Sequence, residues 1–228
     1  MIAEGNRESA ARRTASAYAK YVAALAIDGH RYDALWRAAR EAVDLGEVGR
    51  DAAARAALYR QATDYARRAV AANPGDAEGY FHLSRAIGRT ALNVGVRERV
   101  KYAIDVRTNA LRALELQSRH PGASHVMGVW NAEVMRLNGI TRRIAKAFPG
   151  GAVFNSASWA EAVRYMEQSV ASEPNRLVHL LDLARVYRDM GRTADARTTF
   201  ALALRAPDTD ANHGLYRGAA ERELRALR

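Results

Sequence analysis

Residues 177–208 carry a spacing of small and large side chains that strongly constrains the fold. With Leu177 as position 1, large residues fall at positions 4, 7, 11 and 24 and small ones at positions 8, 15, 20 and 27. The large residues are Leu180, Leu183, Tyr187 and Phe200, and the small ones are Ala184, Gly191, Ala196 and Ala203. Small residues let two helices approach closely, large ones fill the space beside them, and glycine suits the turn. The spacing predicts two antiparallel helices, ended by Pro207.

This spacing is similar to that of the tetratricopeptide repeat (TPR), whose period is about 34 residues. Applied upstream, it predicts an all-α chain, an α-solenoid of about four TPR-like helix pairs in a single superhelical domain over residues 1–228. The expected repeats are 32–74, 77–121, 122–174 and 177–208. An N-terminal packing helix is expected at 7–26 and a C-terminal capping helix at 214–227, because a solenoid needs polar ends.

The three upstream repeats fit less regularly. The first is expected to place its helices at 32–46 and about 51–72, with Gly46 at the turn. The second is expected at 77–94 and about 97–118. The third, at 122–138 and 157–172, has a long connection that contains Phe148–Phe154, and such insertions often carry function.

Composition narrows the class of protein. Of 228 residues 49% are hydrophobic, which allows a buried core, and no apolar run reaches the roughly 18 residues that a membrane span needs. With no signal peptide at Met1, the expected location is cytoplasmic, or periplasmic if an export signal has been removed. The absence of cysteine is compatible with either compartment. The net charge of +10 indicates either a partner with carboxylates or phosphates, or the codon bias of a GC-rich bacterial genome.

Several segments after Asp76 resemble one TPR family. They are His120-Pro121, His125–Trp130, Lys101–Ile104, the Phe148–Phe154 insert and Ala157–Trp159. Together they are similar to the regulator-of-microtubule-dynamics family, which includes a mitochondrial protein tyrosine phosphatase-interacting protein. The resemblance covers about residues 75–212 and departs at Val129, where the family has arginine before the tryptophan.

The resemblance implies a helical adaptor and, for some relatives, lipid binding in the TPR groove. The transmembrane anchor of the animal members is not found in this sequence. Microtubule association is not carried over, because the composition is bacterial in character, and the bacterial relatives have no defined role.

The sequence contains no recognisable signature of catalysis. The six histidines form no metal-ligand motif, and neither a nucleophile elbow nor a phosphate loop occurs. We therefore expect no enzyme activity, no metal and no cofactor. Nucleic acid is a weaker candidate partner, because the basic residues alternate with acids and lack an RNA-binding aromatic motif.

Superposing the repeats aligns aromatic and basic residues on the first helix of each pair. Positions 2, 5, 9 and 12 of that helix face the groove of a TPR, and position 16 lies one turn further along. The candidate ligand-binding residues at these positions are Trp36, Arg40, Phe81, Arg85, His125, Arg136, Arg185 and Arg188. Arginines on neighbouring repeats would lie about 10 Å apart and could bind carboxylates in bidentate fashion.

Three interpretations of these arginines remain open. The arginine row could bind an acidic peptide or protein segment, which makes the chain a non-catalytic scaffold. It could instead bind an anionic lipid or small ligand, whose apolar part would lie on the aromatic row. In the third interpretation the arginines pair internally with acids of the same helices, such as Asp33, Asp44, Glu78 or Asp189.

Overall fold

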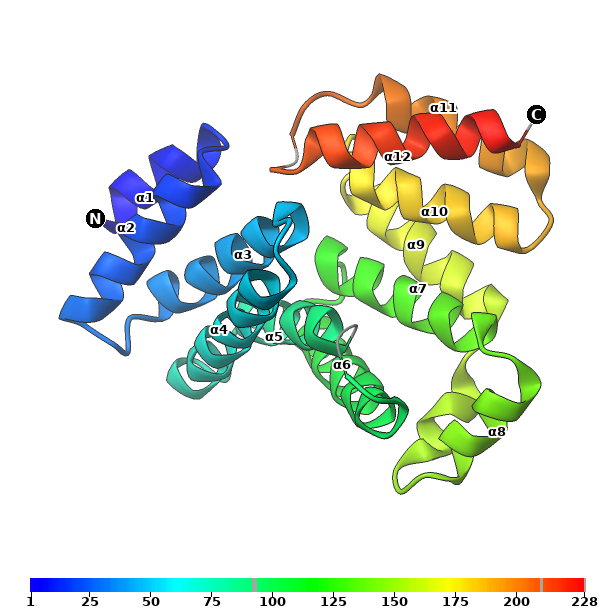
Figure 1. The fold of residues 1–228 in the computed structure, drawn as a ribbon, viewed down its shortest axis with the longest axis horizontal. Coiled ribbons are helices and arrows are strands. Elements are labelled where there is room, and N and C mark those ends of the chain that lie inside the picture. Colours follow the sequence, from blue (N-terminus) through cyan, green and yellow to red (C-terminus); the bar gives the residue numbers. More distant parts are fainter. Residues whose placement is uncertain (92–93, 210, 228) are drawn as a thin grey trace. The chain divides into compact units, whose positions relative to one another are not determined.

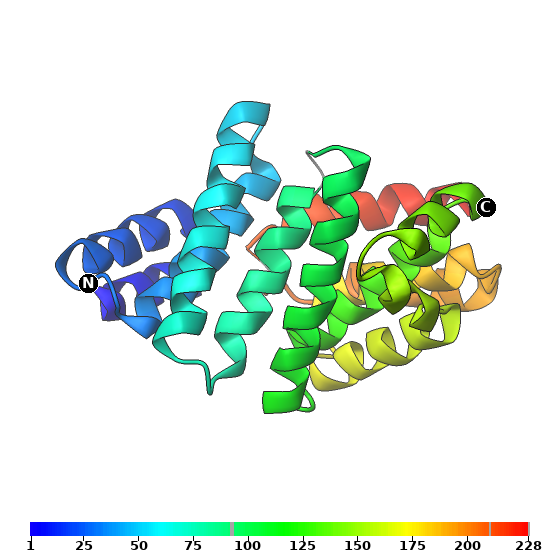
Figure 2. The same ribbon diagram turned by 90° about the horizontal axis from the view of Figure 1, so that it is seen from below.

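The computed structural model describes residues 1–91, 94–209 and 211–227, and these residues form helices and no strand. Their contacts divide the chain into two compact units, Met1–Ser118 and Arg119–Arg228 (Figures 1 and 2). Each unit is built from antiparallel helix pairs, so the prediction of an all-α chain of TPR-like pairs is confirmed. The single superhelical domain stays a prediction, since each unit is described by itself.

Unit 1 contains a helical hairpin followed by two TPR-like pairs. The hairpin packs α1 against α2, and the pairs are α3 with α4 and α5 with α6. The bounds are Ile2–Ala10 for α1, Thr14–Ile27 for α2, Tyr32–Val48 for α3, Ala52–Ala72 for α4, Ala77–Thr90 for α5 and Val96–Leu116 for α6.

Unit 2 contains two further pairs, a short insert and a final helix. The pairs are α7 with α9 and α10 with α11, and α12 packs on α10 and α11. The bounds are Pro121–Arg136 for α7, Gly139–Ala147 for α8, Gly151–Ser156 for the 3-10 helix η2, Trp159–Ser172 for α9, Leu177–Asp189 for α10, Thr193–Arg205 for α11 and His213–Ala226 for α12.

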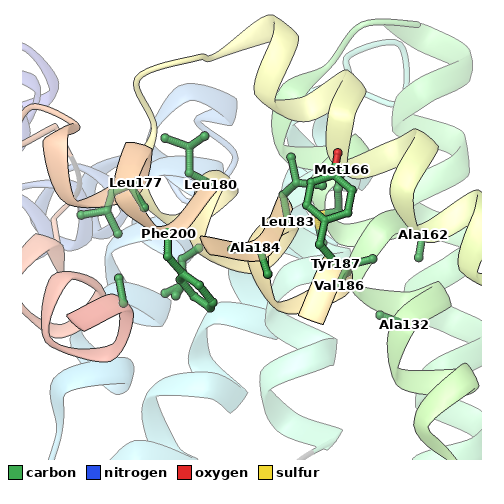
Figure 3. Close-up of a cluster of buried hydrophobic side chains, with 14 residues drawn as sticks. Ala132, Ala162, Met166, Leu177, Leu180, Leu183, Ala184, Val186, Tyr187 and Phe200 are labelled. Atoms are coloured by element: carbon green, nitrogen blue, oxygen red, sulfur yellow. The ribbon is translucent and has the colours of Figure 1, made fainter. Parts of the chain in front are cut away.

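The small residues lie where the helices of a pair approach most closely. In the last pair Ala184, Ala196 and Ala203 are fully buried, and Phe200 fills the space beside them. Figure 3 shows Phe200 and Ala184 within this cluster. Alanine occupies the corresponding buried positions 8, 20 and 27 of the first pair. Gly191 has a φ of +74° at the turn between α10 and α11, a conformation that glycine adopts without strain. The spacing that predicted the repeat is confirmed in both pairs.

The prediction of one N-terminal helix at 7–26 was wrong, because the chain reverses at residues 11–13. Arg12 has a φ of +57°, and its backbone N–H donates to the carbonyl of Ser9. The reversal lays α1 on α2, where Gly5 contacts the ring of Tyr21 so closely that a side chain there would clash. No glycine marks this turn, so no signal in the sequence indicated it.

Two predicted helix ends were also wrong. Helix α3 continues to Val48, and Gly46 lies inside it, where the ring of Tyr59 leaves no room for a side chain. Gly46 therefore allows Tyr59 to pack closely against α3 and does not form the turn that was expected there. Helix α5 ends at Thr90 and not at residue 94, while part of the predicted end, residues 92–93, lies outside the described residues.

The long connection between α7 and α9 is folded. It forms α8 and η2, which pack against each other. Gly150, with a φ of +81°, makes the turn between them. The capping helix was predicted at 214–227 and is found as α12 at His213–Ala226, where it covers the apolar surface of the last pair.

Replacing Phe200 with alanine should destabilise unit 2 by about 3–5 kcal/mol, because the side chain is fully buried and its removal leaves a cavity. Urea unfolding of the full chain measures this loss. Leu202→Ala on the same helix is the control, since Leu202 is 49% exposed and its loss should change stability by about 0.5 kcal/mol or less. Equal losses from the two variants would contradict the assigned core.

Candidate functional site

In unit 1 the four candidate residues come from two neighbouring first helices. Trp36 and Arg40 lie one turn apart on α3, and Phe81 and Arg85 lie one turn apart on α5. Since α3 and α5 pack on each other, the structure brings the four residues onto one surface, which we call the first-helix face of unit 1.

An aromatic stack occupies the centre of this face. The His82 ring lies parallel to Trp36, with centroids 5.3 Å apart and planes 7° apart, and also contacts Phe81 at 4.5 Å. The guanidinium groups of Arg37 and Arg40 lie 4.1 and 5.4 Å from the Trp36 ring centroid, within the range of cation–π attraction. The face therefore combines an indole ring and cationic groups on one surface.

Arg40 also neutralises a buried acid. Its Nε and Nη2 atoms donate to Oε1 of Glu41 at 3.0 and 2.7 Å, and Nη2 donates to Ser9 of α1 at 2.7 Å. Burial raises the pKa of the Glu41 carboxyl, and Arg40 opposes that rise. Removing Arg40 would leave Glu41 buried without its cation, which is strongly destabilising.

Arg85 connects the two first helices of unit 1. Its Nη2 donates to Asp44 of α3 and, at 3.2 Å, to Glu47 of α3. Arg89 adds a second bridge to Glu47 at 2.6 Å. These ion pairs join consecutive repeats through their first helices.

Unit 2 repeats this arrangement with its own first helices, α7 and α10, and with the capping helix α12 beside α10. The first-helix face of unit 2 contains His125, Arg136, Arg185 and Arg188. The Nε2 atom of His125 on α7 lies 2.8 Å from Oδ2 of Asp182 on α10, and Nη1 of Arg185 donates to the other carboxylate oxygen at 2.8 Å. Burial alone would raise the pKa of Asp182, but the hydrogen bond and charge of His125 and the charge of Arg185 hold it well below its usual range.

Two arginines of α10 hold one carboxylate of the capping helix. Arg185 donates from Nε and Nη2 to Oε1 of Glu223 at 2.9 and 2.5 Å. Arg188 donates from Nη1 to Oε2 of the same residue at 2.7 Å. The two guanidinium groups together form a carboxylate-binding pair of the kind that Arg geometry favours.

Arg136 forms the last ion pairs of the first-helix face of unit 2. It donates from Nε and Nη2 to Asp189 on α10, and from Nη1 to Glu133 at 2.5 Å. Asp189 also accepts from Arg188 at 2.9 Å. A continuous series of hydrogen bonds and ion pairs thus runs from His125 through Asp182, Arg185, Glu223, Arg188 and Asp189 to Arg136.

Sequence reasoning placed the basic residues correctly on the first helices but missed most of their partners. Asp44 and Asp189 were named as partners on the same helices, but Asp44 pairs with Arg85 of the neighbouring helix α5, and Asp189 pairs with Arg136 of α7 as well as with Arg188 of its own helix. Glu41, Glu47, Asp182 and Glu223 were not identified. A signal was present for part of this set, because Asp44 and Asp189 both occupy position 13 of their repeats. That regularity predicts an acid one turn beyond the arginine of position 9.

The comparisons with known proteins identify the family. The family model for "Regulator of microtubule dynamics protein 1-3" matches residues 2–228. The chain belongs to this family. Regulator of microtubule dynamics protein 3 of Mus musculus is 25% identical over 183 residues, which are 79% of this chain and 38% of the mouse protein. Protein 1 of Bos taurus is 27% identical over 145 residues, 62% of this chain and 44% of the bovine one.

This member of the regulator of microtubule dynamics family therefore spans less than half the length of those two curated relatives. Its fold is similar to that of a thermophilic TPR protein of Thermus thermophilus, with a TM-score of 0.70, 21% identity and 97% of each chain covered. The family resemblance seen in the sequence is thus confirmed, and so is the TPR fold. Within the described residues no helix is both long and apolar enough to cross a membrane.

The stability of unit 1 should fall as the pH drops from about 6.5 to about 4, because of His82. Its side chain is 3% exposed, and burial lowers its pKa to about 4, although Glu78 lies 3.3 Å from Nε2. The unfolded chain takes up the proton near pH 6.5 while the folded chain stays neutral, so acid favours unfolding.

His82→Phe keeps a ring against Trp36 and removes the titration, so the variant should lose less stability than the wild type between about pH 7 and about pH 5. The difference should approach roughly a kilocalorie per mole for each pH unit below the unfolded pKa. Urea unfolding of both proteins at each pH measures it. Identical pH profiles for the two proteins would refute the assignment.

Proposed function

We propose that this chain is a non-catalytic scaffold that binds an acidic segment of a protein partner on its first-helix faces. The observation that supports this most strongly is the pair formed by Arg185 and Arg188. These two residues hold the carboxylate of Glu223 through at least three hydrogen bonds, so the geometry for binding a carboxylate side chain is already formed.

Ligand binding at this pair works by exchange. Arg185 and Arg188 donate their hydrogen bonds to acids of the chain, so an incoming carboxylate takes the place of Glu223. The side chains of both arginines are about one-third exposed, which leaves them open to an approach from solvent. A segment with several acidic residues can displace the single Glu223 carboxylate. Once its first carboxylate is bound, the effective concentration of its other carboxylates near the remaining arginines is high.

The faces of the two units offer different contacts. Unit 1 adds Trp36, Phe81 and the cations beside the indole ring, a surface suited to an apolar or planar group next to an acid. Unit 2 offers mainly guanidinium groups. An acidic segment with interspersed aromatic or aliphatic residues fits both surfaces.

The comparisons support the scaffold part of the proposal through the fold alone. TPR helix pairs present extended surfaces made from successive repeats, and such surfaces serve binding. The names of the relatives ascribe a role in microtubule dynamics to those proteins. The arginines pair internally, as in the third interpretation of the sequence, but mostly with acids of neighbouring helices, and we take these pairs as the resting state of the same arginines.

Opposite effects are expected from the two sides of one ion pair. Glu223→Gln frees Arg185 and Arg188 and should strengthen the binding of a fluorescent oligoglutamate peptide several-fold. Arg185→Gln with Arg188→Gln should weaken it about tenfold or more, the loss expected for a charge-assisted bidentate contact. Fluorescence anisotropy at low ionic strength measures both, because salt screens exposed charges.

The matched control is Arg205→Gln, an exposed arginine on α11 that removes the same charge away from the face. It should leave the affinity almost unchanged. Unchanged affinity in the double arginine variant, or equal loss in the control, would show that the peptide binds through general charge. Native mass spectrometry tests the lipid interpretation: a co-purified lipid mass that is lost in the double arginine variant would contradict a peptide ligand.

A further inference from the structure

The insert between α7 and α9, which consists of α8 and η2, contributes no residue to the first-helix faces. It is nevertheless a folded element. Helix α8 begins with Asn138, whose side chain accepts from the backbone N–H of Thr141 at 2.8 Å. Figure 1 shows α8 beside the end of α7 and on the opposite side of unit 2 from α11 and α12. It therefore has solvent on one side.

Contacts of η2 and of the residue before α9 fix the insert on the unit, and α8 is held through η2. The Phe154 ring of η2 stacks on Trp130 of α7 with centroids 5.7 Å apart. Gly151 lies directly against the carbonyl of Ala145, where any side chain would clash with the backbone. The backbone N–H of Ser158 donates to the side chain of Asn131 at 3.2 Å. Because Ala145 packs against η2, the opposite face of α8 points outward.

That outward face is apolar. Ile140 is 77% exposed and Ile144 is 57% exposed, and they lie one turn apart on the same side of the helix. Ala147, a further turn along, is exposed as well. Exposed isoleucines one turn apart form a stripe, not the scattered apolar residues that a surface ordinarily carries.

Basic side chains flank the stripe. Arg143 and Lys146 are exposed on one side of it, and no ion pair or hydrogen bond engages either side chain within the described residues. Between Glu133 and Glu161 the sequence contains no acid. This segment therefore differs from the first-helix faces, where arginines are matched by carboxylates.

We propose that α8 docks onto the surface of an anionic lipid bilayer. Ile140 and Ile144 enter the headgroup region, and Arg143 and Lys146 contact the lipid phosphates. The arrangement has the features of an interfacial helix, an apolar stripe with basic residues beside it. Attraction to anionic lipid adds to the burial of the two isoleucines.

The size and shape of the stripe favour a bilayer over a protein partner. A stable protein interface buries about 800 Å² on each side, well beyond what two isoleucines and one alanine expose. A protein would also need a groove complementary to the protruding side chains, whereas a bilayer interface takes them without one. Docking by one short helix is weak, reversible and sensitive to salt.

Vesicle sedimentation with the full chain tests the proposal. The wild type should pellet with vesicles of roughly three parts phosphatidylcholine to one part phosphatidylserine, and much less with pure phosphatidylcholine. Ile140→Ser with Ile144→Ser should reduce binding about tenfold, and Arg143→Gln with Lys146→Gln should reduce it on anionic vesicles. All four substitutions lie on exposed positions, so the thermal unfolding of the variants should match the wild type.

The matched controls are Leu202→Ser and Arg205→Gln, which remove an exposed apolar residue and an exposed cation from α11. Both should bind vesicles as the wild type does. Wild-type protein that stays in the supernatant with anionic vesicles would overturn the proposal and leave a protein as the occupant of the stripe. Equal losses in the control and the α8 variants would also overturn it.

Discussion

The close approach of two helices over alanine determines how the other parts of this structure can be arranged. Where Ala184, Ala196 and Ala203 are fully buried, α10 and α11 pack closely, and large side chains such as Phe200 fill the space beside them. A small residue occupies the corresponding position 8 of every pair, namely Ala39, Ser84, Gly128 or Ala184. The first helices of successive pairs pack on each other within a unit. Side chains one turn apart on neighbouring first helices can then reach each other.

The charged residues of the first helices use this proximity. Arg85 joins α5 to α3, His125 and Arg136 join α7 to α10, and Arg185 and Arg188 join α10 to α12. Partly exposed pairs of this kind contribute little stability individually. Their main effect is to place guanidinium groups in fixed positions and in contact with carboxylates, which is the geometry that an acidic ligand requires.

The sequence predicted the features that repeat and missed those that occur once. Small residues at fixed positions recur in each pair, so the helix pairs and the positions of Arg40, Arg85 and Arg185 followed from the spacing. The reversal at Arg12 depends on one local backbone conformation with no glycine to indicate it. Glu223 lies on the capping helix, outside any repeat, and its contact with Arg185 exists only after folding. The parallel stack of His82 on Trp36 likewise depends on how α3 and α5 pack, which no single-helix pattern shows.

The proposed binding mode requires Arg185 and Arg188 to exchange Glu223 for a carboxylate of the ligand. A crystal structure of the chain bound to an oligoglutamate peptide would show whether this exchange occurs. We expect a peptide carboxylate between the two guanidinium groups, with the Glu223 side chain displaced toward solvent. A peptide bound elsewhere, with Glu223 still held by both arginines, would contradict the exchange.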